Sequence, residues 1–225
     1  MNITSWGEGV SIHPRLGSNP EWWAAVPPDI APDLLEKAVS DEGSKIPALV
    51  KNVKRIYDAT SSYKGTQLIF TDRAQAGGID VNVNNVIREK LIDAGIREEE
   101  IVIMPHADAG MVPVLDENGK QVLEDEVDVD GNVTMVKLYQ TKQDEVSDKV
   151  RSGVYRVMLG STERGGTGLN LQDRVSGIHH MDAPWTSTGL EQRLGRGLRQ
   201  GNRIEALAEE ANAELLPMEN IIYIV

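Results

Sequence analysis

The chain has 225 residues, a formal net charge of -12 and no cysteine. This length suffices for one α/β domain with a full core, and the lack of cysteine excludes disulfides and thiolate metal sites. Its 40% hydrophobic and 26% charged residues are typical of a globular protein rather than a disordered chain or a coiled coil. No apolar run is long enough to span a membrane, and the N-terminus lacks a signal-peptide pattern, which predicts a cytoplasmic protein.

The negative charge is concentrated in one stretch of the sequence. Residues 105–132 contain eight Asp and Glu residues and one Lys, a net charge of -7, which leaves -5 for the rest of the chain. The overall balance argues against strong independent binding to nucleic acid, because such binding depends on Lys and Arg displacing counterions.

The N-terminal half predicts an irregular arm followed by alternating helices and strands. Residues 1–43 are rich in Pro and Trp and show no sustained period. From Ser44, a possible N-cap, apolar residues follow helical spacing, and "TQLIFTD" then indicates a buried strand. A second amphipathic helix ends at Gly95, and "EIVIM" follows as the next strand. This alternation predicts a parallel sheet covered by helices.

An acidic insert interrupts the alternation at about residues 105–139. "VLDENGKQVL" and "VDVDGNVTMV" each centre an Asn-Gly or Asp-Gly pair on alternating residues, which predicts two β-hairpins. The acidic side chains favour a solvated face. They could instead repel DNA from this surface or attract a basic partner.

The alternation resumes after the insert. The sequence predicts a helix over residues 143–151, the strands "VYRVMLGS" and "SGIHHM", a helix that carries several arginines, a helix at "AEEANAELL" and a strand at "NIIYIV". Because the chain ends within that strand, we expect it to be a piece of a longer protein. The predicted fold is an α/β, three-layer parallel sheet with helices on both faces, plus an inserted acidic β-hairpin region, all within residues 44–225.

The crowding of arginines in "EQRLGRGLRQGN" predicts an anionic ligand. An acidic protein gains no solubility from four guanidinium groups within eleven positions: Arg193, Arg196, Arg199 and Arg203. On a helix, Gln192, Arg196 and Arg199 are spaced i, i+4 and i+7 and therefore share one face. Guanidinium groups match phosphate oxygens well. The alternative interpretation is a surface helix with solvated arginines.

Two glycines within the same helix support the ligand hypothesis. Gly195 and Gly197 each cost roughly 1 kcal/mol relative to Ala, which a purely structural helix has no reason to tolerate. We expect a ligand or another backbone to approach the helix closely.

A glycine-rich loop follows the strand in "MLGSTERGGTGLNLQ". Ser161 and Thr162 lie at the carboxyl end of that strand, which is the edge where open parallel sheets bind ligands. Glycines at 165, 166 and 168 leave backbone N–H groups free to face an anion. Together with the arginine helix, this loop predicts two adjacent strand ends that converge on one negatively charged ligand.

These segments resemble a known family. "TQLIFTD", "LGSTERGGTGLNLQ" and "EQRLGRGLRQGN" are similar to motifs IV, V and VI of superfamily-two helicases and translocases, most closely the Swi/Snf-like branch. The motifs belong to the second of the two RecA-like lobes in that family. "HHMDAPWTSTGLEQR" further resembles large helicase and DNA-methylase proteins of bacterial mobile elements and phages. The resemblance covers residues 44–225 apart from the insert and does not explain the arm.

The resemblance implies catalytic and ATP-binding residues. Arg199 matches the arginine finger that reaches the γ-phosphate of ATP, Arg196 matches its companion, and Gln192 matches the glutamine that opens motif VI. Motif V implies nucleotide contacts from three further residues, which are Gly166, Gly168 and Asn170.

The resemblance also implies contacts with DNA. Thr162, with Ser161, matches the hydroxyl that contacts the phosphate backbone, and Thr71 ends the motif IV strand beside the same track.

The missing motifs predict a divided motor. No G-x-x-x-x-G-K-[ST] segment and no strand ending in a magnesium-binding Asp-Glu pair are found. The resemblance therefore implies that ATP and Mg²⁺ are bound mainly by an N-terminal RecA-like lobe outside this sequence. The expected partners are that lobe, DNA and a possible methyltransferase domain, in the bacterial cytoplasm.

Two alternatives remain at the sequence level. "DAPW" is close to the D-P-P-[YFW] motif with which amino-methyltransferases hold a flipped base, although Ala183 replaces a proline and only 14 residues separate Asp182 from Gly168. The chain could also be a non-catalytic interaction module. For His179 and His180, adjacent on a strand, a zinc site is improbable, and we expect one core and one exposed histidine.

Overall fold

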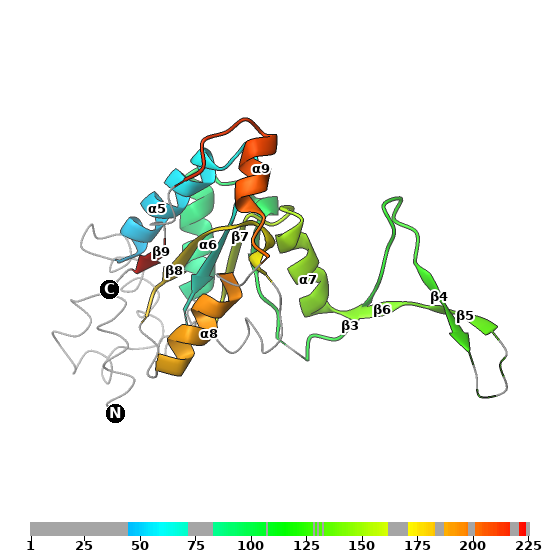
Figure 1. The fold of residues 1–225 in the computed structure, drawn as a ribbon. Helices are drawn as coiled ribbons and strands as arrows, with labels where there is room; N and C mark the ends of the chain where they lie inside the picture. Colours follow the sequence, from blue (N-terminus) through cyan, green and yellow to red (C-terminus); the bar gives the residue numbers. More distant parts are fainter. Residues whose placement is uncertain are drawn as a thin grey trace, which may run out of the picture.

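A computed structural model describes residues 45–71, 83–106, 108–127, 129, 131, 133–161, 171–182, 187–197, 201–216 and 221–223. Its centre is a five-stranded sheet of order β2-β7-β1-β8-β9, in which all neighbouring strands are parallel (Figure 1). The strands are β1 (Thr66–Phe70), β2 (Ile101–Ile103), β7 (Val157–Gly160), β8 (Val175–His180) and β9 (Ile221–Tyr223). The predicted parallel sheet is therefore confirmed.

One face of the sheet is covered by α5 (Lys45–Ala59) and α6 (Val83–Asp93). The apolar residues that set the helical period of α5, including Leu49 and Val53, are fully buried against Ile69 of β1. The apolar face of each helix thus packs on the sheet, as its sequence spacing predicts. Gly95, at a φ of +88°, follows the end of α6, where glycine readily adopts this left-handed conformation.

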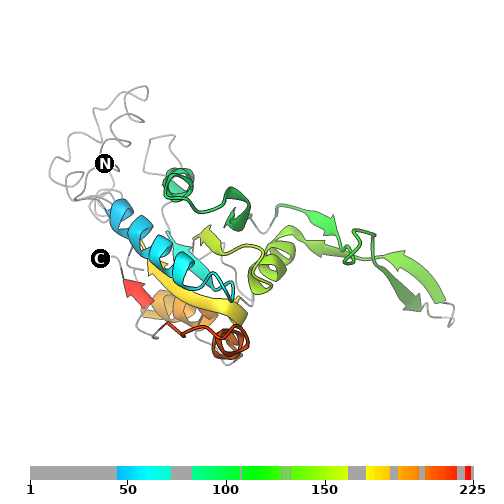
Figure 2. The ribbon, with the colours of Figure 1, turned by 90° about the horizontal axis from the view of Figure 1, so that it is seen from above.

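The opposite face is covered by α7 (Lys142–Arg151) and α8 (Ser187–Gly197). Because side chains alternate along a strand, Leu68 and Phe70 point away from Ile69 and pack with Val146 and Val150 of α7. Seen from above, α5 and α8 lie on opposite sides of β8 (Figure 2). The α/β three-layer arrangement is therefore confirmed.

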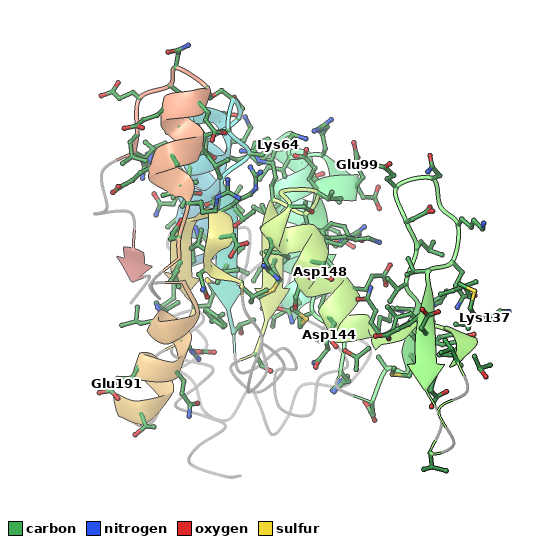
Figure 3. The ribbon with its side chains drawn as sticks, turned by 45° about the vertical axis from the view of Figure 1, so that its right-hand side comes forward. Lys64, Glu99, Lys137, Asp144, Asp148 and Glu191 are labelled. Carbon is green, nitrogen blue, oxygen red and sulfur yellow. The ribbon has the colours of Figure 1, made fainter. Side chains whose placement is uncertain are left out.

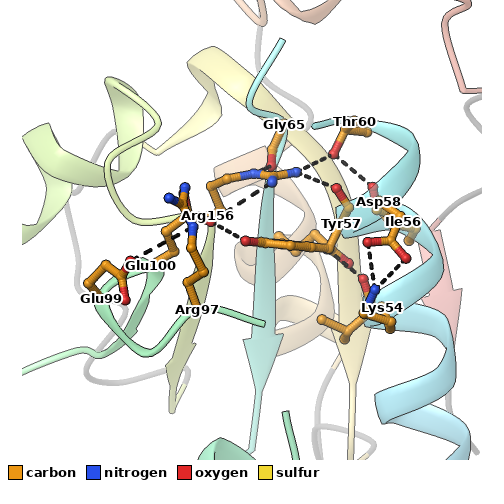
Figure 4. A network of polar contacts seen from close by, with 12 residues as sticks. Lys54, Ile56, Tyr57, Asp58, Thr60, Gly65, Arg97, Glu99, Glu100 and Arg156 are labelled. Carbon is orange, nitrogen blue, oxygen red and sulfur yellow. Dashed lines mark hydrogen bonds and ion pairs between the residues drawn. The ribbon is translucent and has the colours of Figure 1, made fainter. Parts of the chain in front are cut away.

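A buried cation ties the elements together at the amino ends of the strands (Figure 4). Arg156 is 3% exposed and donates to the carbonyl of Tyr57 at 2.6 Å, the hydroxyl of Thr60 at 3.0 Å and the carbonyl of Gly65 at 3.3 Å. Its guanidinium carbon lies 3.9 Å from the centre of the Tyr57 ring, and its Nη1 lies 3.9 Å from a carboxylate oxygen of Glu100. Burial lowers the pKa of Arg156. This arginine stabilises the sheet at the edge opposite to the predicted site.

The acidic insert forms a two-stranded ribbon that projects away from the sheet (Figure 1). Strand β4 (Leu123–Val127) pairs with β5 (Val133–Lys137), as the second hairpin motif predicts. The first motif forms a tight turn, closed by a single bridge between Leu115 and Gln121. At the base of the ribbon, β3 (Met111–Pro113) pairs with β6 (Tyr139–Thr141). This last pairing joins segments distant in sequence and has no local turn signal.

The last predicted helix begins earlier than expected. Helix α9 (Ile204–Glu210) replaces the helix predicted at residues 208–216, because the side chain of Asn202 accepts from the backbone N–H of Ile204 at 2.9 Å. Asn212, with a φ of +48°, lies just beyond its end. Two short 3-10 helices, η1 (Glu98–Glu100) and η2 (Gln172–Arg174), precede β2 and β8. The predicted arm and the Ser44 cap lie outside the described residues.

In the part of the chain that the structure describes, no helix combines the length and apolar character needed to cross a membrane.

Candidate functional site

The carboxyl ends of three neighbouring strands form the edge at which the sequence predicts a site. In the sheet register, Phe70 of β1 is paired with Gly160 of β7 on one side and with His180 of β8 on the other. The next residue of β1, Thr71, donates its backbone N–H to the carbonyl of Gly160 at 3.0 Å. Thr71 and Ser161 are therefore brought to the same edge, one after each strand.

The two hydroxyl residues at this edge differ in exposure. Thr71 is 1% exposed, and its Oγ1 has no hydrogen-bond partner in the structure as described. Ser161 is partly exposed and is the more accessible of the two. The third predicted hydroxyl, Thr162, lies outside the described residues, as does the rest of the glycine-rich loop with its predicted contacts at Gly165, Gly166, Gly168 and Asn170.

Helix α8 is held against this edge by a buried ion pair. Arg193 is fully buried, and its Nη2 donates to a carboxylate oxygen of Asp182 at 2.6 Å. Its Nη1 donates to the backbone carbonyl of Asp182 at 2.8 Å. The guanidinium carbon also lies 5.6 Å from the ring centre of Phe70. These contacts fix α8 to the ends of β1 and β8.

The location of Arg193 corrects the prediction that all four arginines serve an external anion. The anion that Arg193 binds is internal, because Asp182 lies two residues beyond the end of β8 and its carboxylate pairs with Arg193 of α8. A buried charge is tolerated in proteins when it is paired and hydrogen-bonded in this way. Arg203 is also separate from the site face, since it precedes α9 and its side chain is exposed.

The two histidines of β8 are both buried, which corrects the expectation of one exposed histidine. His179 is 0% exposed and His180 is 3% exposed. Burial lowers the pKa of His179 to about 3, so this ring is neutral at neutral pH, with its Nε2 at 2.9 Å from Oε1 of Gln67. The His180 ring stacks on Phe70 with 6.0 Å between ring centres, and its Nδ1 lies 3.3 Å from Nη1 of Arg193. Helices cover both faces of β8, so neither side chain reaches solvent.

The buried position of Arg193 fixes the rotation of α8. At 100° per residue, Gln192 and the backbone position of Arg196 lie about 100° and about 60° around the helix from Arg193, on the same side of it. The side chain of Gln192 is accordingly exposed. Gln192 therefore lies to one side of the buried face of α8 and is accessible at the carboxyl edge of the sheet. Arg199 lies beyond the described part of α8, so its position stays a prediction.

Open space beside Gly195 fits the close approach of a ligand or a second protein surface. Among the described residues, no heavy atom would lie within 4 Å of a Cβ at this position. By contrast, a Cβ at Gly65 would lie 2.7 Å from the hydroxyl oxygen of Ser176. Packing within the described structure therefore requires glycine at Gly65 but not at Gly195.

The same contacts bear on the methyltransferase hypothesis. In that hypothesis, the carboxylate of Asp182 holds a flipped base. In the structure its side chain is only 11% exposed and is paired with Arg193. Asp182 is therefore occupied in stabilising the fold.

Residues 101–201 match the family model described as "Helicase conserved C-terminal domain". The match begins at β2, includes the glycine-rich loop after β7 and helix α8, and ends at residue 201. A search of curated protein sequences gave no match.

Two solved structures are similar to the chain at a distance. The crystal structure of the C-terminal part of the Fun30 ATPase domain is 16% identical, with a TM-score of 0.41, 80% of this chain covered and 49% of the other. A Dbp5 variant from S. cerevisiae, bound to RNA and ADP BeF3, is 16% identical, with a TM-score of 0.39, 78% of this chain covered and 38% of the other. The chain thus spans half or less of these two structures.

The family match lies on the parallel sheet and its helical layers. Residues 101–201 are thus similar to the conserved C-terminal domain of helicases, and they include strands β2, β7 and β8 of the parallel sheet. The predicted α/β fold, a parallel sheet with helices on both faces, is confirmed.

The sequence predicted the site edge but missed its internal support. The motifs identified the loop and the helix, whereas Arg193, Asp182 and Phe70 form their cluster only through the sheet register and the return of α8. A buried arginine and a surface arginine look the same in sequence. One sequence signal could have distinguished Arg193 as buried: on a helix, it does not share the face of Gln192, Arg196 and Arg199.

Proposed function

We propose that this chain is the second motor lobe of an ATP-dependent DNA helicase or translocase of the Swi/Snf-like branch. The observation that carries the proposal is the helicase family match over residues 101–201, which includes both the loop after β7 and the arginine helix α8. The sheet register adds support, because it brings the carboxyl ends of β1, β7 and β8 to one edge.

In this proposal, α8 supplies the catalytic arginines. Arg199 would act as the arginine finger, Arg196 as its companion, and Gln192 would orient the nucleotide beside them. The ion pair between Arg193 and Asp182 fixes the position of α8. The guanidinium groups of Arg196 and Arg199 would therefore meet the phosphates with little loss of conformational entropy. The loop positions Gly166, Gly168 and Asn170 would complete the nucleotide contacts on this lobe.

The residues present fit part of a site for ATP and Mg²⁺. Guanidinium groups suit phosphate oxygens, and the open space at Gly195 leaves room beside α8. When bound, ATP supplies the phosphoanhydride bond whose hydrolysis drives the motor. Because the sequence has no phosphate-binding loop, an N-terminal RecA-like lobe would hold most of the nucleotide.

The DNA contacts belong to the same sheet edge. Ser161 and Thr162 would donate hydrogen bonds to backbone phosphates. Thr71, which is buried at the same edge of the sheet, would help to hold these residues in position. Hydroxyl contacts of this kind position a strand without reading its sequence. We place the protein in the bacterial cytoplasm, as part of a mobile element or phage protein that could also carry a methyltransferase domain.

A comparison of ATP hydrolysis by two forms of the protein tests this proposal. Turnover would be measured for the 225-residue chain and for a protein that joins it to the N-terminal lobe, each with and without duplex DNA. We expect DNA-stimulated hydrolysis only from the two-lobed protein. Stimulated hydrolysis by the chain alone would contradict the division of the site, and a two-lobed protein without activity would favour an interaction module.

A further inference from the structure

The ribbon formed by β3 to β6 exposes apolar side chains outside the candidate site. Five of them are among the most exposed large hydrophobic residues of the described structure: Met111 at 60%, Leu123 at 43%, Val133 at 61%, Met135 at 65% and Tyr139 at 50%. Figure 3 shows that side chains on the ribbon have no second layer packed over them. Among the residues that the structure describes, none forms a covering layer on the ribbon.

The register of β4 and β5 places three of these apolar residues, Leu123, Val133 and Met135, on one face. Leu123 is paired with Lys137, Asp125 with Met135, and Val127 with Val133. Side chains of paired residues point to the same side of a ribbon and alternate along each strand. One face therefore carries Leu123, Val133 and Met135 together with Asp125 and Lys137, whereas Glu124 and Glu126 point to the other.

A two-stranded ribbon with exposed apolar side chains is expected to bind another protein surface. Such ribbons are at best marginally stable alone in water, and contiguous exposed apolar patches mark interaction sites. The surrounding acidic residues, with a net charge of -7 over residues 105–132, select a partner surface that is basic as well as apolar.

A groove with these properties lies between α5 and α6. It has a volume of about 480 Å³ and an apolar lining that includes Ile46, Val50 and Ala94. Three lysines also line it: Lys51, Lys54 and Lys90. Lys54 pairs with Asp58 at 2.5 Å and Lys90 lies 3.8 Å from Asp93, whereas Lys51 has no ion-pair partner among the described residues.

We propose that the ribbon of one copy of this chain docks into the α5–α6 groove of a second copy. Leu123, Val133 and Met135 would enter the apolar groove, and Asp125, which shares their face, would meet its lysines. The ribbon projects away from α5 and α6 in two views related by a 90° turn, so it does not reach the groove of its own chain (Figures 1 and 2). The contact is therefore head-to-tail and can join copies in succession.

Sedimentation velocity of the chain over a range of concentrations tests the proposal. We expect the average mass to rise with concentration for the unmodified chain. Met135→Asp on the ribbon and Lys51→Glu in the groove should each weaken association about tenfold or more. Val154→Asp serves as the matched control, because Val154 is 51% exposed but lies outside both surfaces, and it should associate normally.

Mixing the two variants separates this contact from any other. Met135→Asp retains a functional groove and Lys51→Glu retains a functional ribbon, so an equimolar mixture should form dimers that neither variant forms alone. An unmodified chain that stays monomeric at every concentration would overturn the proposal. A mixture that fails to dimerise while the unmodified chain associates would do the same, and circular dichroism would confirm that both variants are folded.

Discussion

Replacing Arg199 by Ala in the two-lobed protein is expected to lower kcat for ATP hydrolysis by a factor of about 10³ to 10⁵. This loss corresponds to a rise of roughly 4 to 7 kcal/mol in the activation barrier. The physical reason is that an arginine finger stabilises charge that develops on the transferred phosphoryl group. Binding of ATP should change much less, because we propose that the N-terminal lobe holds most of the nucleotide. Steady-state hydrolysis and equilibrium binding of a nucleotide analogue would measure the two effects separately.

Arg203→Ala is the matched control for this experiment. Arg203 lies four residues beyond Arg199, and its exposed side chain precedes α9. Its removal should leave kcat within a few fold of the unmodified value. If the two-lobed protein with Arg199→Ala hydrolyses ATP at the unmodified rate, Arg199 is not a catalytic residue.

Replacing Asp182 by Ala is expected to destabilise the chain by about 3 to 5 kcal/mol, because it leaves the buried guanidinium of Arg193 without its anion. The Nη2 of Arg193 lies 2.6 Å from the Asp182 carboxylate, and the Arg193 side chain is completely buried. Such a loss is a large fraction of the 5 to 15 kcal/mol that is typical of a folded domain. Urea denaturation followed by circular dichroism would measure it.

Lys54→Ala provides the contrast, because it removes an ion pair on the surface. The side chains of Lys54 and Asp58 are 33% and 57% exposed, so this pair should contribute less than about 1 kcal/mol. Combining Asp182→Leu with Arg193→Met should recover much of the stability, since both buried charges are then removed. An Asp182→Ala loss as small as that of Lys54→Ala would show that the pair does not anchor α8.

The layers of the fold could be predicted because its elements carry strong local patterns. Helix α5 has apolar residues at helical spacing, whereas β1 and β7 are buried runs too short for helices, so spacing and run length together distinguish them. The pairing of β3 with β6 could not be predicted, because it joins residues about 30 positions apart with the second hairpin between them. The sequence pattern places the start of α9 four residues late, because it gives no sign of the contact in which the side chain of Asn202 accepts from the N–H of Ile204.

The candidate site could be predicted in its outline but not in its internal chemistry. Topology brings Thr71 and Ser161 to one edge because parallel strands end together, and this follows from the alternation of elements. The burial of Thr71 and the internal pairing of Arg193 depend on how α8 and the neighbouring strands pack in three dimensions. Composition therefore suggested more ligand-binding arginines than the structure supports.

A structure of the two-lobed protein with an ATP analogue tests the central claim most directly. The account predicts that guanidinium nitrogens of Arg196 and Arg199 lie about 3 Å from terminal phosphate oxygens, across the interface between the lobes. Guanidinium groups that point away from the nucleotide, or that are paired with carboxylates of this lobe, would contradict it.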